Sequence, residues 1–431
     1  MNEQRLLVIS VDAMEDVDAN YARTLPSFAR VLEGCAQAQI RSVYPTLTYP
    51  AHSAQLTGCP PAQSGVFNNV LMQPGIDHPD WFWDYSFLNV PSILDAAHED
   101  GRRVAAVQWP VTAGAPFDII IPEIGNVEST GGLQATMHSV CSERGFELFE
   151  RHQDKIITDP KTNHGPFAAA VGADILREDH PEVMFIHFVE LDSARHKYGP
   201  TGPHVNAALE AVDERLGVLF AGLDDSGHAE QTNIVIVSDH GQLETLQHTN
   251  LNILFRDRGF LKTDEENNLL DWDIYLHSAG LSGQIFLKEG LSSQRLREIE
   301  DLLDEIVAEP KYRIREILTA ADARELYGLD GPFSWIVESE PGVIVGGALD
   351  RRVVVRRQDE DFRGYLGNHG HHPTQGNQPV FFAKGPAFLP EADGGRREMI
   401  EEAATFAKVL GVELPTAVGS AMSDLLAPEL R

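Results

Sequence analysis

The sequence predicts an α/β protein whose central, largely parallel β-sheet lies between layers of helices. Three observations favour this fold class. Short, wholly apolar runs recur along the chain, segments with helical periodicity separate them, and acidic residues closely follow several of the runs. Strands that are apolar on both sides are typical of parallel sheets covered on both faces, because the helices that connect such strands pack against the sheet.

The first expected elements are a strand, a helix and a second strand. Residues 6–11 form a run that is apolar except for Ser10 and predicts a buried strand, and Asp12 follows it. A helix is expected over residues 24–34, since Pro26 lies in its first turn and a glycine stands at its end. Residues 38–43 are expected to form the next strand.

Thr48 is the residue around which we expect the rest of the chain to be organised. It stands between the second strand and a short helix that is expected to follow Pro50 and to end at Gly58. Backbone N–H groups and the helix dipole at such a turn favour an anionic ligand, and a hydroxyl there is placed to attack a phosphoryl group. Taken alone, Thr48 is better interpreted as a helix cap, which is a common role of threonine.

The alternation of strands and helices continues through the middle of the chain. The segment from about residue 110 to residue 165 has weak periodicity and predicts no clear element. Around it, strands are expected over residues 103–108, 183–189 and 233–237, and helices over residues 91–101, 167–176 and 205–219.

The composition changes after the last of these strands. Residues 245–355 are richer in charges and loop-forming residues and contain one strong amphipathic helix at residues 293–307. A strand at residues 380–382 and a helix at residues 399–410 then resume the earlier pattern. We therefore expect a core made of residues 1–244 and 356–431, and an inserted cap region made of residues 245–355.

The composition also excludes several classes of partner. The formal net charge of -31 predicts repulsion from nucleic-acid polymers and from anionic membranes. No apolar segment is long enough to span a membrane, and the N-terminus lacks the basic start of a secretory signal, so a cytoplasmic location is expected. The three cysteines have no C-x-x-C spacing, which argues against a disulfide framework and against a thiolate zinc site. The oligomeric state stays open.

Aspartate and histidine residues follow the predicted strands. The carboxyl ends of strands in an open α/β sheet line one crevice, so residues placed there by different strands can converge. Three aspartates and three histidines suit two divalent ions, with zinc favoured and manganese as the alternative, and two such ions can hold the attacking and leaving oxygens of a phosphoryl displacement. These residues are Asp12, Asp192, His196, Asp239, His240 and His369.

Each of these residues has a plainer interpretation when it is taken alone. Asp12 could cap a helix, and an Asp-His pair after a strand is a common turn. His52 lies one turn into the helix of Thr48 and is expected to pack or to form a hydrogen bond. His371 and His372 are expected to be loop or pocket residues.

The order of the motifs decides between these interpretations. Asp12 comes first, then P-T-x-T-Y-P-x-H around Thr48, then Asn69, D-x-x-x-H, S-D-H-G and G-x-H-G. This order resembles the nucleotide pyrophosphatase/phosphodiesterase family (type I phosphodiesterases) of the alkaline phosphatase superfamily, over residues 6–260 and 364–388. The resemblance implies an alkaline phosphatase-like fold and a two-metal hydrolase that cleaves small phosphodiester or pyrophosphate substrates through a phospho-threonine intermediate.

The resemblance also implies roles for single residues. Thr48 would be the nucleophile, and Asn69 would donate to a non-bridging phosphoryl oxygen. The chain departs from the family pattern at Leu191, where proline is more usual, and at Gln242, where methionine often follows S-D-H-G. It also has His371-His372-Pro373 where an aromatic residue and an asparagine are frequent in the animal enzymes. The implied ligands are Asp12, Thr48, Asp239 and His240 for one metal ion, and Asp192, His196 and His369 for the other.

The residues beside Thr48 bear on the substrate class. Monoesterases of the superfamily typically place an arginine beside the nucleophile, where it clamps two charged oxygens. Here the neighbours are Leu47 and Tyr49, which favours diesters or pyrophosphates over monoesters. Tyr49 could stack on a base or pack against the sheet. Arg195, inside the D-x-x-x-H motif, could swing into the pocket as the missing cation, although a solvated loop residue is the commoner case.

Four alternative functions remain at this point. They are a phosphomonoesterase, a phosphonoacetate hydrolase, a cofactor-independent phosphomutase and a non-catalytic metal-binding protein. Phosphonoacetate hydrolases need a pair of lysines for the substrate carboxylate, and residues 101–120 contain no lysine. Phosphomutases usually carry a serine nucleophile and basic residues for their substrate. This chain has a threonine, Thr48, at the expected nucleophile position and an acidic composition, and both argue against a phosphomutase. An intact ligand set with a nucleophile argues against a non-catalytic role.

Overall fold

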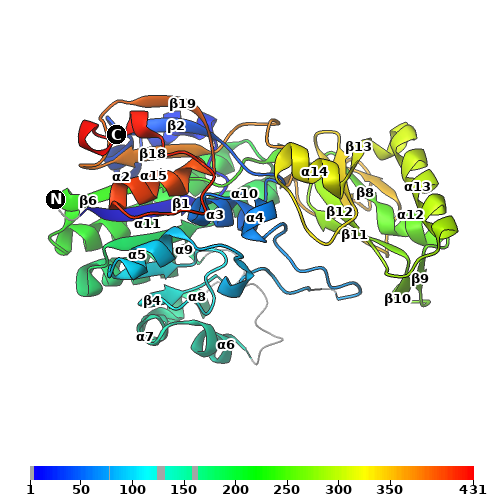
Figure 1. Cartoon of the computed structure of the whole chain (residues 1–431), viewed down its shortest axis with the longest axis horizontal. Helices are drawn as coiled ribbons and strands as arrows, with labels where there is room; N and C mark the ends of the chain where they lie inside the picture. The colour runs from blue at the N-terminus through cyan, green and yellow to red at the C-terminus, as the bar shows by residue number, and fades with distance from the viewer. Residues whose placement is uncertain (1–3, 77, 124–131, 158–163) are drawn as a thin grey trace.

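The centre of the molecule is an eight-stranded, mostly parallel β-sheet (Figure 1). The computed structural model describes residues 4–76, 78–123, 132–157 and 164–431. Only β18 runs antiparallel to its neighbours, β2 and β6, so the predicted fold class is confirmed. In sheet order the strands are β19 (Asp393–Glu398), β2 (Ala36–Arg41), β18 (Val380–Lys384), β6 (Thr232–Val237), β1 (Arg5–Val11), β5 (Val183–Phe188), β3 (Val104–Val107) and β4 (Ile119–Ile121).

Helices cover both faces of this sheet because its strands are apolar on both sides. In β1, Leu7, Ile9 and Val11 belong to one hydrophobic cluster, while Leu6 and Val8 belong to the cluster on the other face. The first cluster includes residues of α2 (Pro26–Leu32), α7 (Glu143–His152), α9 (Gly165–Asp174) and α11 (Pro203–Asp225), and the second includes residues of α3 (Thr48–Thr57), α5 (Ile93–Glu99) and α15 (Glu401–Leu410).

The strands between residues 247 and 356 belong to smaller sheets beside the central one (Figure 1). The helices here are α12 (Leu251–Asp257), α13 (Ser293–Ala308) and α14 (Ala320–Tyr327). The proposed division into a core and an inserted cap region stays a prediction. The sheets are β11 (Ile274–Ala279) with β12 (Ser282–Leu287), β14 (Trp335–Ser339) and β13 (Ile314–Thr319); β15 (Val343–Gly346) with β8 (Gln247–Asn250) and β16 (Val354–Arg356); and β10 (Leu269–Trp272) with β9 (Leu261–Thr263).

The remaining elements connect these parts. A two-stranded sheet joins β7 (Leu243–Glu244) to β17 (Gly367–Asn368), which brings two distant segments of the chain together. The other helices are η1 (Asp16–Asp18), α1 (Ala19–Ala22), α4 (Pro61–Ser64), η2 (Tyr85–Phe87), α6 (Leu133–Val140), α8 (Asp154–Ile157), η4 (Ile175–Asp179), α10 (Glu190–Tyr198), η5 (Ala229–Gln231), η6 (Pro310–Tyr312), η7 (Ser423–Leu425) and η8 (Pro428–Leu430).

Three expectations about local structure need correction. Helix α3 begins at Thr48 and not after Pro50, because proline is tolerated in the first turn, where its missing N–H is not needed. The strand expected at residues 38–43 lies at Ala36–Arg41. The expectation of no clear element over residues 110–165 was wrong, since β4, α6, α7 and α8 lie there; residues 124–131 and 158–163 of that segment fall outside the described part of the chain.

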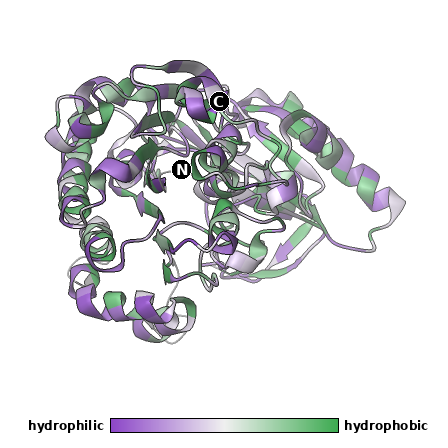
Figure 2. Cartoon of the chain, turned by 60° about the vertical axis from the view of Figure 1, so that its left-hand side comes forward, coloured by the Kyte–Doolittle hydropathy of each residue, from purple (hydrophilic) through white to green (hydrophobic). Residues whose placement is uncertain are grey.

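Hydrophobic residues are concentrated in the central strands, and hydrophobic and hydrophilic residues alternate around the outer helices (Figure 2). This pattern is typical of helices that bury one side against a sheet. Within the described ranges, no helix combines the length and the apolar character needed to cross a bilayer. The cytoplasmic location stays a prediction.

Candidate metal centre and nucleophile

The candidate site lies at the carboxyl ends of three neighbouring strands. Strand β1 lies between β5 and β6 in the sheet and is parallel to both, so the residues that follow these strands adjoin one another. Asp12 follows β1, and Asp239 follows β6 after one residue. The structure brings the six predicted aspartate and histidine ligands into two groups, Asp12 with Asp239 and His240, and Asp192 with His196 and His369.

The first group consists of two carboxylates that face one imidazole nitrogen. Nε2 of His240 lies 3.1 Å from Oδ2 of Asp239 and 3.6 Å from Oδ1 of Asp12. All three side chains are buried, and neither of these two carboxylate oxygens has a hydrogen-bond partner among the described residues. Burying a carboxylate oxygen without a hydrogen-bond partner costs free energy. A cation bound by these two oxygens and by Nε2 of His240 would offset that cost, so the geometry fits a metal site.

The electrostatics of this group also favour a cation. Burial and the neighbouring carboxylate of Asp239 raise the pKa of Asp12 well above its usual value. Burial raises the pKa of Asp239 to about 6 and lowers that of His240 to about 3. A divalent ion would reverse these shifts for the carboxyls and would hold the imidazole neutral, which is the form that binds metals.

Thr48 lies beside the first group. Its hydroxyl oxygen is 3.2 Å from Nε2 of His240, and its side chain is 8% exposed. Thr48 is the first residue of α3, whereas Leu47 is the N-cap, and no side chain caps this end of the helix. The hydroxyl therefore faces the candidate metal ligands and does not serve as the helix cap.

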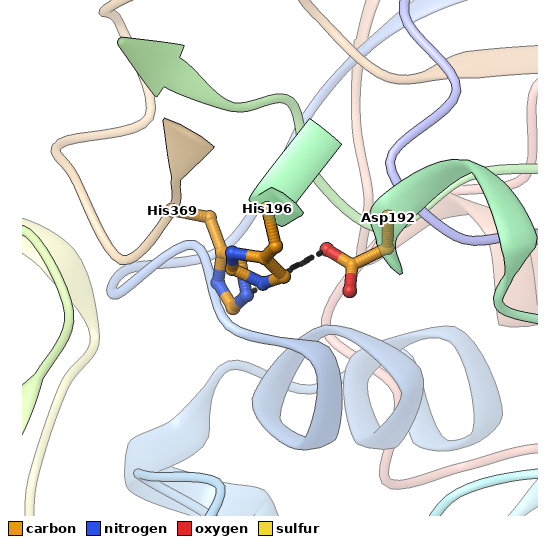
Figure 3. A group of neighbouring side chains, drawn as sticks. All are labelled: Asp192, His196 and His369. Atoms are coloured by element: carbon orange, nitrogen blue, oxygen red, sulfur yellow. Dashed lines mark ion pairs between the residues drawn. The ribbon is translucent and has the colours of Figure 1, made fainter. Parts of the chain in front are cut away.

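The second group has two histidines whose Nε2 atoms face one carboxylate (Figure 3). Oδ1 of Asp192 lies 3.3 Å from Nε2 of His196 and 3.9 Å from Nε2 of His369. Nδ1 of His196 donates to the carbonyl of Gly367 at 2.8 Å, and Nδ1 of His369 donates to the carbonyl of Thr46 at 3.1 Å. Because Nδ1 carries the proton in each of these rings, each Nε2 atom keeps an unprotonated lone pair, as a metal ligand requires.

The two groups are in contact with each other. The rings of His240 and His369 are stacked, with their centroids 3.9 Å apart and an interplanar angle of 16°. Burial opposes the ionisation of Asp192, yet the neighbouring imidazoles, His196 foremost, hold its pKa below the usual range. The two candidate metal sites therefore adjoin each other through the stacked rings of His240 and His369. This arrangement suits chemistry in which two ions act on one substrate group.

Asn69 lies beside α3, the helix that begins at Thr48, and not among the candidate ligands. Its Oδ1 accepts a hydrogen bond from the backbone N–H of Tyr49 at 2.9 Å. Because an amide that accepts through its oxygen keeps its NH₂ group as a donor, Asn69 can still donate to a substrate oxygen.

Both interpretations of Arg195 are wrong: it does not enter the pocket, and it is not a solvated loop residue but a buried residue of α10. Its side chain is 1% exposed, and its guanidinium lies 2.5 Å from Oδ2 of Asp18 and 3.3 Å from Oε2 of Glu15. It also donates to the carbonyl of Pro200. A charge that is buried with two carboxylates cannot swing away without leaving them unpaired, so the ion pairs fix Arg195 inside the protein.

The neighbours of Thr48 take the plainer roles. Tyr49 is buried, and its ring lies edge-on to that of Trp81 with the centroids 5.3 Å apart, so it packs and does not offer a free stacking face. His52 donates from Nδ1 to the carbonyl of Thr48 and accepts from the hydroxyl of Ser10, both at 2.8 Å. His52 therefore packs and forms hydrogen bonds, as expected.

The other two histidines differ in exposure. His371 is 3% exposed and its Nδ1 has no hydrogen-bond partner among the described residues, whereas His372 is only half-buried. Nδ1 of His372 bonds with the hydroxyl of Thr374 at 2.7 Å, and His372 lines a cavity of about 210 Å³ with Tyr44 and Tyr327. His372 is thus a pocket residue outside both ligand groups.

Sequence reasoning missed three residues that contact or surround the ligands. Nε2 of His187, the residue before the last in β5, lies 3.1 Å from Oδ2 of Asp12. Gln242 donates from Nε2 to Oδ1 of Asp192 at 2.5 Å. Burial raises the pKa of Glu123 to about 7, with the charge of Asp192 adding to the shift. Gln242 was noted only as a departure after S-D-H-G, and no motif marks His187 or Glu123; the one signal for His187 was a histidine within an otherwise apolar strand.

Comparisons with known proteins agree with the geometry. The family model described as type I phosphodiesterase / nucleotide pyrophosphatase matches residues 6–326. Rat ectonucleotide pyrophosphatase/phosphodiesterase family member 1 is 26% identical over 246 residues, which are 54% of this chain and 24% of that protein. The human bis(5'-adenosyl)-triphosphatase ENPP4 is 23% identical over 262 residues, which are 58% of this chain and 50% of that protein.

Solved structures show the same fold. Murine ectonucleotide pyrophosphatase / phosphodiesterase 5, in an inactive form in complex with AMP, matches with a TM-score of 0.68 and 20% identity, over 99% of this chain and 100% of that chain. The human counterpart matches with a TM-score of 0.69 and 18% identity, over 98% of this chain and 100% of that chain. The matched region is about a quarter of the length of the longer curated relatives, family members 1 and 3.

Proposed function

Because the chain belongs to the type I phosphodiesterase / nucleotide pyrophosphatase family, we propose that it is a hydrolase of phosphodiester or pyrophosphate bonds in small molecules. The observation that carries this proposal is the position of the Thr48 hydroxyl, 3.2 Å from Nε2 of His240 and at the first residue of α3. A nucleophile at a helix N-terminus attacks where backbone N–H groups favour anionic oxygens.

The proposal includes two divalent ions as cofactors. Asp12, Thr48, Asp239 and His240 would hold one, and Asp192, His196 and His369 the other. Zinc fits best, since imidazole and carboxylate ligands suit it, and manganese is the alternative. Bound ions would supply a lowered pKa for the attacking hydroxyl and charge neutralisation at the leaving oxygen.

The reaction proceeds in two displacements at phosphorus. In the first, Oγ1 of Thr48 gives up its proton to solvent and forms a bond to phosphorus, while the bond to the leaving oxygen breaks and that oxygen departs with the electron pair, which yields a phospho-threonine. In the second, a water oxygen bonds to phosphorus, the bond to Oγ1 breaks, and one proton of that water passes to Oγ1. The NH₂ group of Asn69 and the first N–H groups of α3 stabilise the equatorial oxygens as charge accumulates on them.

Substrates with a single charge at the reacting phosphorus fit this site better than monoesters. A monoester brings a second charged oxygen, which a guanidinium would normally clamp. Leu47 and Tyr49, on either side of the nucleophile, are uncharged and buried. Arg195 is held by Glu15 and Asp18, so it cannot supply that cation.

Turnover of three substrates tests the proposal. Purified protein with zinc is assayed on bis-p-nitrophenyl phosphate, on p-nitrophenyl phosphate and on a nucleoside triphosphate. We expect a higher kcat/KM for the diester or for the triphosphate, cleaved to a nucleoside monophosphate, than for the monoester. A clear preference for the monoester would overturn the diesterase assignment, and transfer of the phosphoryl group back to substrate without release would favour a mutase.

A further inference from the structure

Gln242 is buried between the two ligand groups. It is 3% exposed and stands two residues after His240. Its Nε2 donates to Oδ1 of Asp192 at 2.5 Å and lies 3.3 Å from the backbone carbonyl of the same residue. We propose that Gln242 is a positioning residue that holds the Asp192 carboxylate toward His196 and His369, and this inference rests on the two-metal function proposed above.

The oxygen that Gln242 contacts is the one that faces the second metal group. Oδ1 of Asp192 is the atom that lies 3.3 Å from Nε2 of His196 and 3.9 Å from Nε2 of His369. A carboxylate on a helix can rotate about its side-chain bonds, so a donor is needed to keep one oxygen aimed at these nitrogens. Hydrogen bonds to metal ligands of this kind change metal affinity by about 10–100-fold.

Gln242 is itself held in place by Glu15. Oε1 of Glu15 accepts the backbone N–H of Gln242 at 2.9 Å. Oε2 accepts from Nδ2 of Asn377 at 2.8 Å and lies 3.3 Å from Nη1 of Arg195. Arg195 lies on α10 together with Asp192 of the second group, and Gln242 closely follows Asp239 and His240 of the first group. Glu15 therefore links α10 to the segment that carries these first-group ligands.

The surrounding chain leaves little room for the amide to move. A Cβ atom at Gly367 would lie 2.8 Å from Oε1 of Gln242 and 2.7 Å from the carbonyl oxygen of Arg195, so only glycine fits there. Gly367 belongs to β17, two residues before His369. The amide is thus enclosed by segments that carry ligands of the second group. Methionine would fill the space but offer no donor.

A merely structural role makes a different prediction. If Gln242 only satisfied buried polar groups, its loss would lower the stability of the whole protein and would affect both metal groups alike. A positioning role lowers affinity at the second group alone. Measuring the two binding events separately therefore distinguishes the roles, and this measurement does not depend on any substrate.

The experiment is a zinc titration of metal-free protein by calorimetry, with the bound metal counted after equilibrium dialysis. The variant His369→Ala lacks a ligand of the second group and so identifies that binding event. In Gln242→Met, whose side chain has similar volume but no donor, we expect the second zinc to bind about 10–100-fold more weakly and the first to bind as in the wild type.

Two further variants keep the test decisive. Gln247→Met is the matched control, because Gln247 is 2% exposed in β8 and its amide donates to the hydroxyl of Thr249 and the carbonyl of Lys311, neither of which belongs to a ligand group. It should leave both affinities unchanged. Gln242→Asn keeps a polar amide that is one methylene too short, and replaces the methionine variant if that variant does not fold.

The outcomes separate the inference from the proposed function. If folded Gln242 variants bind the second zinc within about 3-fold of the wild type, the positioning role is overturned. An equal loss at both sites would overturn it as well and would indicate a structural role. If the wild-type protein binds fewer than two ions, the two-metal function itself fails, whatever the Gln242 variants do.

Discussion

The hydroxyl oxygen of Thr48 and Nε2 of His240 lie 3.2 Å apart, although the two residues are 192 positions apart in the chain. This contact places a potential nucleophile within hydrogen-bond distance of the nitrogen that also faces Asp12 and Asp239. A buried hydroxyl in this position has no capping role in α3. The contact therefore makes Thr48 the first residue to test.

Replacing Thr48 by alanine should reduce kcat by at least about 1,000-fold, because no other group can form the covalent intermediate. The variant should fold normally, since only a hydroxyl and a methyl group are lost. Thr48→Ser should keep measurable activity. Steady-state kinetics on bis-p-nitrophenyl phosphate, with circular dichroism to check folding, measures both effects.

Thr57→Ala is the matched control for this experiment. Thr57 is the last residue of α3, is buried like Thr48, and donates its hydroxyl to the carbonyl of Ser53 at 2.7 Å. Its loss should leave kcat within a few-fold of the wild type. If Thr48→Ala behaved like Thr57→Ala, Thr48 would not be the nucleophile.

Removal of metal should abolish activity and lower thermal stability together. Burial raises the pKa of both Asp12 and Asp239, and the charge of Asp239 raises that of Asp12 further, so ions that bind only the folded state stabilise it. At a free concentration 1,000 times its Kd, each ion contributes about 4 kcal/mol. Calorimetric melting after dialysis against chelator, with elemental analysis of the sample, measures the loss.

Zinc or manganese should restore both properties, whereas calcium should not, because calcium prefers all-oxygen ligands and these groups contain histidines. Full activity in protein that elemental analysis shows to be free of metal would rule out the two-metal mechanism.

Arg195→Met should destabilise the protein without changing its preference between diester and monoester. The substitution leaves Glu15 and Asp18 buried without their cation, and the loss of one partner of a buried ion pair costs about 3–5 kcal/mol. Urea unfolding of the zinc-loaded protein measures the loss. The ratio of kcat/KM values for bis-p-nitrophenyl and p-nitrophenyl phosphate should stay as in the wild type.

Arg177→Met is the surface control, because Arg177 is 40% exposed and its pair with Asp174 is worth less than about 1 kcal/mol. A selective loss of monoester turnover in Arg195→Met, beyond that in the control, would mean that Arg195 reaches the substrate after all.

Glu338 should make the protein less stable as pH rises through neutrality. Burial raises its pKa from 4.5 to about 7, even though the hydroxyl of Tyr44 donates to its Oε2 at 2.6 Å. The folded state therefore binds a proton more tightly than the unfolded state. Its stabilising contribution is fully present below pH 4.5 and is lost between pH 4.5 and about 7, by at most about 3 kcal/mol.

Glu338→Gln removes this dependence, because the amide stays neutral at every pH. Urea unfolding at pH 5.5 and at pH 8.5 should show that the variant gains stability relative to the wild type at the higher pH. A difference in unfolding free energy between variant and wild type that is the same at both pH values would contradict the prediction.

The fold was predictable because burial leaves a strong local signal. Strands β1, β5 and β6 are apolar on both faces, and the helices between them have one apolar side, so the sheet with two helical layers follows from periodicity alone. The segment around α7 was not predictable in this way. Its three buried residues, Gly145, Leu148 and Phe149, stand among charged ones in a helix of ten residues, so the apolar pattern is short.

The sequence by itself determined that Asp12, Asp192, His196, Asp239 and His240 converge at the carboxyl edge of the sheet, because they follow the parallel strands β1, β5 and β6, whose ends meet there. His369 follows β17, whose place depends on its antiparallel pairing with β7. Only the tertiary structure decided where the other side chains point. Arg195 lies between Asp192 and His196 in the chain, yet it is aimed at Glu15 and Asp18, while Gln242 reaches across to Asp192. Sequence spacing places a residue on an element, but its partners come from segments far away in the chain. A charged or polar side chain is stable in the interior only where it has a hydrogen-bond or ion-pair partner, so those distant segments decide its direction.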